Sequence, residues 1–445
     1  MRAVIRDCAI ATVDAAGTEH ESGWILIEGD RIAGIGTGPP PVADQVIDAR
    51  GMLATPGLVN CHHHLYQWAT RGLAQDGTLF EWLVHLYPIW ARIDAEIVRD
   101  AASAALGALA RSGCSLSTDH HYVFPAGVGD LLAAEIDAAG EIGLRFHPCR
   151  GSMDLGASAG GLPPDSVIQD PDTILKACEA AITAHHDPSP EAMVQIALAP
   201  CSPFSVTGEL MRASAELARA RGVRLHTHLA ETADEEVFCQ ERFGMRPVEY
   251  LDSLSWLGPD VWLAHCVHLS PPEIKRFADT GTGVAHCPSS NGRLGSGIAP
   301  VPELVAAGVS VGLGVDGAAS NECGELSAEV RQALLMARSR LGPTALTARQ
   351  ALALGTIHGA RCLGRAEHLG SLEVGKLADI ALWQVDDPGQ AGLADPVATL
   401  VLGPPRPVHT LLVGGRVIVR GGQTLGVDGD TLARRARRAS QRIQR

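Results

Sequence analysis

Hydrophobic and polar residues alternate one by one over much of the first fifty positions of the chain. The stretch W-I-L-I-E-G-D-R-I-A-G-I-G, residues 24–36, holds two such runs separated by Glu28-Gly29-Asp30. A period of two places every second side chain on one face of a strand, and a short Gly-containing turn joins two strands into a hairpin. The pattern predicts that residues 1–56 form the N-terminal part of a β-sandwich domain.

Between residues 57 and 364 the pattern changes to short apolar runs that alternate with alanine-rich helical stretches. Two examples are A-E-I-V-R-D-A-A-S-A-A-L-G-A-L-A-R-S-G followed by C-S-L-S-T-D-H-H, residues 95–121, and M-R-A-S-A-E-L-A-R-A-R-G followed by V-R-L-H-T-H-L-A-E, residues 211–231. Repeated alternation of strand and helix indicates a parallel sheet, and this many repeats favour a closed barrel. We therefore expect an α/β fold whose catalytic domain, residues 57–364, is a (β/α)8 TIM-like barrel.

The strand-like alternation returns after residue 364. It covers L-A-D-I-A-L-W-Q-V at 377–385 and the hairpin-like H-T-L-L-V-G-G-R-V-I-V-R-G-G at 409–422. Residues 365–430 are therefore expected to complete the β-sandwich, which both chain ends would build together. Residues 431–445 form a basic helix or tail, which we interpret as a solvated terminal helix with an interaction role as the alternative. Its arginines are Arg434, Arg435, Arg437, Arg438, Arg442 and Arg445.

Composition narrows the classes of partner. The 445 residues carry a formal charge of −14, which argues against a polyanionic partner such as nucleic acid. No apolar run reaches the roughly 18 residues that span a membrane. The N-terminal stretch lacks the continuous apolar segment of a signal peptide, so we expect a cytoplasmic protein. The 11 cysteines form no C-x-x-C pair and are expected to be buried free thiols.

The first candidate for chemistry is a histidine pair after an apolar strand. In A-T-P-G-L-V-N-C-H-H-H-L-Y-Q, residues 54–67, His62 and His64 are two positions apart. Residues with this spacing share one face of a strand and can reach one metal ion together, whereas His63 points the other way and is expected to be structural. Active sites of such barrels lie at the C-terminal ends of the strands, where this pair is predicted to be.

Later apolar runs also end in polar residues that suit chemistry: His226, His228, Glu231, His265, His286 and Asp316. A single one of them would be read as a core histidine or a helix cap. Their recurrence at four successive strand ends indicates one shared site. The predicted metal ligands are three imidazoles and one carboxylate: His62, His64, His228 and Asp316.

This ligand set suits zinc, with iron or manganese as alternatives. The chain has only three lysines, and none ends a predicted barrel strand; they are Lys176, Lys275 and Lys376. A carbamate made from a strand-end lysine, which would bridge two ions, is therefore not expected. We predict one divalent metal ion, zinc first.

Several motifs resemble those of the amidohydrolase superfamily, in its branch of cytosine, guanine and S-adenosylhomocysteine deaminases and triazine hydrolases. They are P-G-L-V-N-C-H-H-H at 56–64, H-L-A-E at 228–231, H-C-P-S-S-N at 286–291, L-G-V-D-G at 313–317 and G-S-L-E-V-G-K-L-A-D at 370–379. Further segments are similar to those of the 8-oxoguanine deaminases: 62–67, 161–166, 199–206 and 314–321. The resemblance implies hydrolysis of 8-oxoguanine to urate and ammonia. Gly292 and Ala318 depart from the pattern, which often has Met and Ser there, and leave fine substrate preference open.

The mechanism we expect begins with attack of metal-bound hydroxide on the amino-bearing ring carbon. Asp316 accepts the water proton and later passes it to ammonia, Glu231 protonates the adjacent ring nitrogen as a general acid, and His265 orients the nucleophile. Gln67 resembles the family position that binds a purine carbonyl. Arg150 is a further candidate for a substrate carbonyl. A core role for His265 and a surface role for Gln67 are the alternatives.

Residues 66–90 carry six of the 18 aromatic side chains. They either cover a flat substrate or pack in the core of a helix. Alternative functions are deamination of guanine, isoxanthopterin or S-adenosylhomocysteine, a triazine aminohydrolase or chlorohydrolase, and an inactive scaffold. The expected partner is a small oxopurine-like substrate, in a homodimer or larger homo-oligomer.

Overall fold

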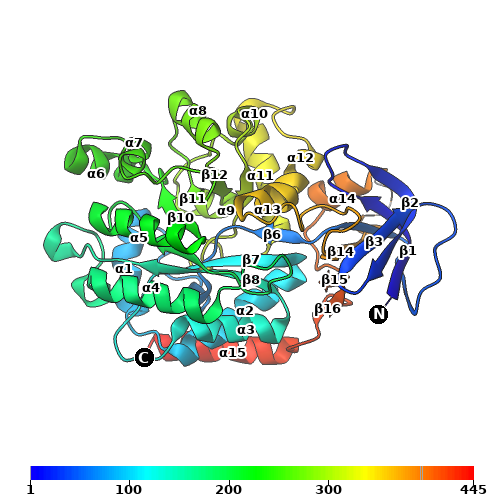
Figure 1. The fold of residues 1–445 in the computed structure, drawn as a ribbon, viewed down its shortest axis with the longest axis horizontal. Helices are drawn as coiled ribbons and strands as arrows, with labels where there is room; N and C mark the ends of the chain where they lie inside the picture. Colours follow the sequence, from blue (N-terminus) through cyan, green and yellow to red (C-terminus); the bar gives the residue numbers. More distant parts are fainter. Residues whose placement is uncertain (1, 391, 393) are drawn as a thin grey trace.

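Two sheets organise the chain, and they lie side by side in Figure 1. The computed structural model describes residues 2–390, 392 and 394–445. One sheet closes into a barrel, and the other is an open mixed sheet that carries the N-terminus. None of the helices in this described part of the chain is long and apolar enough to cross a membrane.

The open sheet is built from both ends of the chain, as the alternation predicted. Its strand order is β17-β16-β15-β14-β5-β1-β2-β3, and β4 pairs with β1. The N-terminal strands are β1 (Arg2–Ala11), β2 (Glu19–Glu28), β3 (Arg31–Gly36), β4 (Gln45–Asp48) and β5 (Met52–Pro56). The C-terminal strands are β14 (Ile380–Gln384), β15 (Thr410–Val413), β16 (Arg416–Arg420) and β17 (Gln423–Thr424). Antiparallel pairing of β5 with β14 joins the two halves.

Eight parallel strands form the closed barrel, which confirms the predicted TIM-like fold. They are β6 (Leu58–Asn60), β7 (Cys114–His121), β8 (Arg145–Ser152), β9 (Ala197–Pro200), β10 (Arg224–Leu229), β11 (Val261–His265), β12 (Gly283–His286) and β13 (Val311–Leu313). The pairing of β13 with β6 closes the ring. All C-terminal strand ends therefore meet at one mouth.

Helices surround the barrel, and many begin at a capping side chain. The Asp94, Asp130 and Thr207 side chains accept hydrogen bonds from the first turns of α2, α3 and α5. The α-helices from the first strand to the fifth are α1 (Leu79–Trp90), α2 (Ala95–Arg111), α3 (Leu131–Ile142), α4 (Pro171–His185) and α5 (Gly208–Arg221). Those that follow are α6 (Ala233–Phe243), α7 (Pro247–Ser253), α8 (Pro271–Thr280), α9 (Pro288–Arg293), α10 (Val301–Ala306), α11 (Leu326–Leu341), α12 (Ala348–Ala353), α13 (Gly359–Cys362), α14 (Pro396–Leu402) and α15 (Gly429–Ile443). Short helical turns are η1 (Leu65–Thr70), η2 (Ala157–Ala159), η3 (Asp165–Val167) and the π turn η4 (Leu354–His358).

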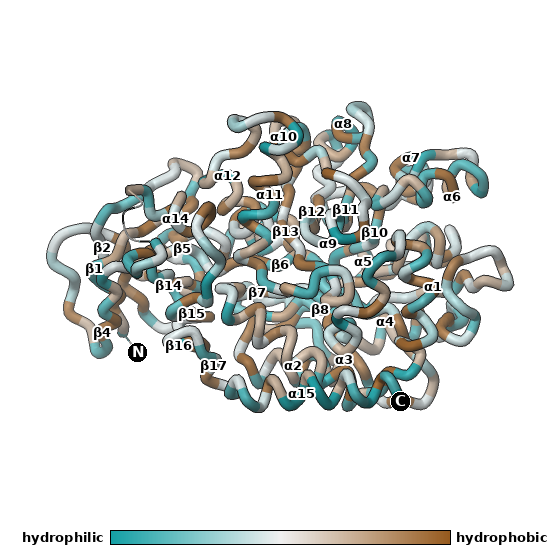
Figure 2. Tube along the Cα trace, turned by 180° about the vertical axis from the view of Figure 1, so that it is seen from behind, coloured by the Kyte–Doolittle hydropathy of each residue, from teal (hydrophilic) through white to brown (hydrophobic). Residues whose placement is uncertain are grey.

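The basic tail forms the helix α15, but it is not simply solvated. Its largely hydrophilic trace runs beside α2 and α3 (Figure 2). Buried Leu432, Ala439 and Ile443 pack inward. Arg435, Arg438 and Arg442 reach acidic side chains of α2, its cap and α3, at Asp94, Glu96, Asp100 and Glu141. These three arginines keep part of their side chains exposed but are also paired, with acidic partners more than 290 positions away in sequence that no local pattern reveals.

A buried ion pair joins the barrel to the open sheet. Arg145, the first residue of β8, donates from Nε and Nη2 to the Asp379 carboxylate at 2.9 and 3.2 Å. The Gly414 amide donates to the same carboxylate at 2.7 Å. This contact lies at the N-terminal ends of the barrel strands, opposite the mouth.

The cysteines are free thiols, as predicted. Ten of the eleven are buried, and Cys323 is exposed.

Candidate active site

The histidine pair that follows β6 reaches Asp316 at the mouth of the barrel. The strand ends at Asn60, and His62 to His64 continue from it to η1. The Nε2 atoms of His62 and His64 each lie 3.3 Å from Asp316 Oδ1. His63 turns away, and its Nδ1 accepts a hydrogen bond from the His64 amide.

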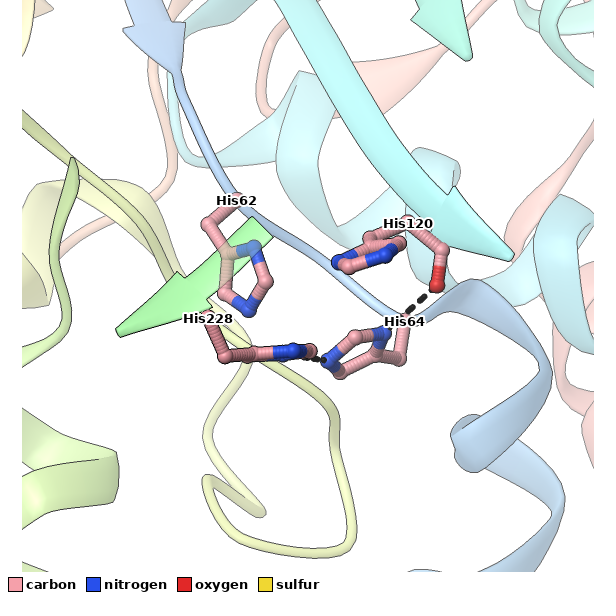
Figure 3. Close-up of side chains that lie close together, drawn as sticks. All are labelled: His62, His64, His120 and His228. Carbon is pink, nitrogen blue, oxygen red and sulfur yellow. Dashed lines mark hydrogen bonds between the residues drawn. The ribbon is translucent and has the colours of Figure 1, made fainter. Parts of the chain in front are cut away.

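The last residues of β10 bring the third imidazole to this point. His228 Nε2 lies 3.1 Å from His64 Nε2, with His62 beside them (Figure 3). The four predicted ligands therefore come together, although they are spread over more than 250 positions of the chain. All four side chains are buried.

The hydrogen bonds made by Nδ1 of His64 and of His228 determine which ring nitrogen is unprotonated. His64 Nδ1 lies 2.7 Å from the His120 carbonyl oxygen, and His228 Nδ1 lies 2.7 Å from the Cys201 carbonyl oxygen. A carbonyl only accepts, so both Nδ1 atoms carry the hydrogen and both Nε2 atoms carry a lone pair. Burial lowers the pKa of both imidazoles well below the usual value, which favours the neutral form that binds metals.

Two lone pairs facing each other at 3.1 Å repel unless a cation lies near both. The fully buried His62 Nε2 also has no hydrogen-bond partner. Imidazole nitrogens beside a carboxylate are the donor set of a borderline divalent cation. The residues present therefore fit a divalent metal ion held by His62, His64, His228 and Asp316.

Glu231 and His265 lie on the rim of this cluster. His265 Nε2 is 3.6 Å from Glu231 Oε2 and 3.9 Å from Asp316 Oδ2. Burial raises the pKa of Glu231 to about 7, despite the nearby His265. Burial alone would lower the pKa of His265, but Glu231 and Asp316 outweigh it and raise that pKa. A carboxyl with a pKa near neutrality is suited to donate and accept protons at physiological pH.

The backbone at these strand ends adopts conformations that side chains rarely favour. Of eight non-glycine residues with positive φ in the described chain, four lie here: Ala230, His265, Cys266 and Asp316. Such strained residues persist where the surrounding structure over-determines them, and they cluster at active sites. One such restraint is the buried Glu235 carboxylate, which accepts hydrogen bonds from the Ala230 and Glu231 amides at 2.8 and 2.9 Å.

A cavity of about 360 Å³, including its opening to solvent, lies over the cluster. Its walls include Gln67 and the aromatic side chains Trp82, Tyr87, Tyr122 and Phe204. The Gln67 amide is 1% exposed, and neither its oxygen nor its nitrogen has a partner.

Gly317 leaves room for the Gln67 amide. A Cβ atom at position 317 would lie only 1.8 Å from Gln67 Oε1. The glycine after Asp316 thus permits the close approach of the amide to the cavity floor.

The aromatic-rich segment 66–90 divides between both predicted roles. Trp82 and Tyr87 line the cavity, whereas Tyr66 and Trp90 pack edge to face with a centroid distance of 5.4 Å. Phe80 lies 5.0 Å from Phe204 between ring centroids. Two of the six aromatic residues thus form the cover and the others pack around it.

The structure does not bring Arg150 to this cavity. Its guanidinium lies over the Phe124 ring, donates to the Gln169 side chain, and lines a separate cavity beside α3 and α4. Arg150 is in β8, but its side chain points outward from the mouth. His286, at the end of β12, is buried and does not line the cavity either.

Some residues around the cluster were not singled out from the sequence. His120 lies beside His62, His64 and His228, with its Nδ1 unpartnered (Figure 3). Ser290 and Ser320 donate to Asp316 Oδ2 at 2.5 and 3.2 Å. The run S-T-D-H-H at the end of β7 was an available signal for His120, because it too is a polar strand end.

A closed parallel barrel that gathers imidazoles and carboxyl groups at its mouth is an arrangement that suits a metal-dependent hydrolase. The chain belongs to the amidohydrolase family, whose model matches residues 53–418. It is an aminohydrolase-type enzyme of that family.

Relatives of known activity span nearly the whole chain. It is 46% identical over 439 residues to 8-oxoguanine deaminase of Pseudomonas aeruginosa, covering 98% of this chain and 97% of that one. It is 37% identical to isoxanthopterin deaminase from an unknown prokaryotic organism, covering 99% and 97%. Its fold is similar to the crystal structure of atrazine chlorohydrolase from Arthrobacter aurescens TC1 complexed with zinc, with a TM-score of 0.93 and 35% sequence identity. The match covers 99% of this chain and 100% of that one.

Proposed function

We propose that this enzyme deaminates 8-oxoguanine by hydrolysis, giving urate and ammonia. The observation that carries the proposal is the convergence of the Nε2 atoms of His62, His64 and His228 beside Asp316, next to Glu231, whose pKa burial raises to about 7. The 46% identity to an 8-oxoguanine deaminase over 98% of the chain supports the choice of ring. An inactive scaffold would need neither the unpaired imidazole nitrogens nor the proton-transfer pair.

The proposed ligands are His62, His64, His228 and Asp316, and the ion is zinc. The chemistry that a divalent ion supplies here is a lowered pKa for water, so that a hydrolytic nucleophile exists at neutral pH. Asp316 takes up the proton of the attacking water. Glu231 gives a proton to the ring nitrogen next to the amino-bearing carbon, which lets that carbon become tetrahedral.

His265 lies between Glu231 and Asp316, where it orients the attacking oxygen and stabilises the negative charge that it carries in the transition state. Asp316 then passes its proton to the amino group, the carbon–nitrogen bond breaks and ammonia leaves, and the proton that remains on the hydroxyl oxygen goes to Glu231 as the carbonyl forms. One water is consumed, and its oxygen becomes the new carbonyl of urate.

Substrate orientation comes from the cavity walls. The unpaired Gln67 amide offers both a donor and an acceptor to the polar edge of an oxopurine. Trp82, Tyr87, Tyr122 and Phe204 supply apolar and aromatic surface for a flat ring. Arg150 has no part in this proposal, because it lines another cavity.

A second candidate is deamination of isoxanthopterin, a larger fused ring, favoured by the 37% identity to isoxanthopterin deaminase. Chlorohydrolysis of a triazine is a weaker alternative. Glu231 favours loss of an amine, since the ring nitrogen then has to receive a proton.

The test is a steady-state assay of ammonia release from 8-oxoguanine, guanine, isoxanthopterin, cytosine and hydroxylated triazines. We expect the highest kcat/KM on 8-oxoguanine. Glu231→Gln, purified in the same way, controls for contaminating deaminase. Turnover of isoxanthopterin alone would select the second candidate, and no turnover of any oxopurine would contradict the proposal.

We also propose a cytoplasmic homo-oligomer, as the free thiols and the family resemblance suggest. Light scattering of the purified protein tests the oligomer.

A further inference from the structure

The three imidazoles of the proposed metal site differ in the kind of group that contacts their Nδ1 atoms. His64 and His228 each give Nδ1–H to a main-chain carbonyl oxygen at 2.7 Å. His62 instead faces a side chain, since its Nδ1 lies 2.8 Å from His226 Nε2. Only His62 therefore depends on a group that a substitution can remove.

The main chain determines which nitrogen of His226 carries the hydrogen. His226 Nδ1 lies 2.8 Å from the carbonyl oxygen of Trp262, which can only accept. In the neutral ring, one nitrogen donates and the other accepts, so His226 Nε2 accepts. The hydrogen between the two rings then belongs to His62 Nδ1, and His62 Nε2 keeps its lone pair on the side of the ligand cluster (Figure 3).

Trp262 restrains both members of this pair. Its ring stacks on His226 with a centroid distance of 4.5 Å and an interplanar angle of 16°. Its indole N–H donates at 2.9 Å to the carbonyl of Cys61, the residue before His62. His62, His226 and Trp262 are all 0% exposed, so these contacts are shielded from bulk solvent.

We propose that His226, held by Trp262, is a positioning residue that sets the tautomer and orientation of His62 and thereby strengthens binding of the divalent ion. Partners that orient metal ligands in this way typically change metal affinity by about 10–100-fold. The inference rests on the proposed metal set and not on the choice of heterocycle.

The main variant is His226→Phe, which removes the acceptor but keeps a ring against Trp262. The zinc dissociation constant, measured by competition with a chromophoric chelator, should rise about 10–100-fold. His226→Gln restores an acceptor oxygen at the place of Nε2 and should recover part of the loss.

The matched control is His147→Phe. His147 is also buried and lies 5.8 Å from the Trp262 ring between centroids, but both of its nitrogens lack a hydrogen-bond partner. This variant should bind zinc as the wild type does. Equal weakening in both Phe variants would overturn the proposal, because it would indicate a packing effect around Trp262.

A spectroscopic measurement needs no variant. In the metal-free wild type, ¹⁵N NMR should find the hydrogen of His62 on Nδ1. A hydrogen on Nε2, or a wild-type zinc affinity in His226→Phe, would overturn the inference. A wild-type protein that binds no zinc or other divalent ion would contradict the proposed function instead, so the two failures are distinguishable.

Discussion

The Arg145–Asp379 junction at the N-terminal end of the barrel and the C-terminal mouth both bury charged and polar side chains, but the two sites differ in how far their hydrogen-bonding groups are paired. At the N-terminal end, the Arg145 guanidinium and the Asp379 carboxylate pair with each other and with the main chain, and no atom of either lacks a partner. At the C-terminal mouth, His62 Nε2 and the whole Gln67 amide have none. Fully paired buried groups serve stability, and unpaired ones aimed at a cavity indicate a ligand.

Glu231→Gln should impair catalysis at the C-terminal mouth and leave the Arg145–Asp379 junction at the N-terminal end intact. The amide keeps the shape of the Glu231 side chain but has no acidic proton to donate, so kcat on the best substrate should fall by about 10²–10⁴-fold. Zinc content and the free energy of unfolding should stay close to wild type. Glu216→Gln, an exposed carboxylate on α5, is the control and should keep full activity. A Glu231→Gln enzyme with wild-type kcat would remove Glu231 from the mechanism.

Asp379→Asn should disrupt the Arg145–Asp379 junction at the N-terminal end of the barrel and leave the C-terminal mouth intact. It leaves the Arg145 charge buried and weakly compensated, which costs about 3–5 kcal/mol of the free energy of unfolding. Urea denaturation measures this loss, and kcat below the transition should be unchanged. Asp252→Asn, which disrupts the exposed Arg276–Asp252 pair, should leave the free energy of unfolding close to the wild-type value. Equal losses in the two variants would contradict the structural role of the junction.

The pH profile should sharpen the assignment of the acid. Glu231 must be protonated to donate, and its pKa is raised to about 7 by burial. Its protonated fraction, and with it kcat/KM, should therefore fall about tenfold per pH unit above about pH 7. The residual activity of Glu231→Gln should lack this decline. A wild-type kcat/KM that rises steadily from pH 7 to 9 would contradict the role of general acid.

The smallest effect is expected at α15. Arg438→Gln removes a half-exposed partner of buried Asp100 and should cost about 1 kcal/mol of unfolding free energy, less at high salt. Arg437→Gln, on the exposed side of the same helix, is the control. An unchanged unfolding midpoint in Arg438→Gln would indicate that the Arg438–Asp100 contact adds no stability, as expected of a solvated helix.

The sequence predicted those parts of the fold and of the candidate site that depend on the local order of apolar and polar residues. Alternation predicted the sheet that both chain ends share, and polar residues at strand ends predicted His228, His265 and Asp316 around the histidine pair. These predictions worked because the C-terminal ends of parallel strands meet at one mouth.

Other features depend on contacts between distant segments. Arg150 is also near a strand end, but the sequence does not reveal that its side chain lies over Phe124. Glu235 was not singled out, because its two hydrogen bonds arise only when the chain turns sharply at Ala230. The acidic partners of α15 belong to α2, its cap and α3, which no local charge pattern connects to the tail.

The most direct test of the account is the metal content of the purified protein. His62, His64, His228 and Asp316 should bind roughly one divalent ion per chain, lost on chelation together with activity and restored with it by zinc. His64→Phe should retain almost none. Less than about half an equivalent in the wild type, with none recovered on reconstitution, would contradict the claim that these four residues form the centre of a metal-dependent deaminase.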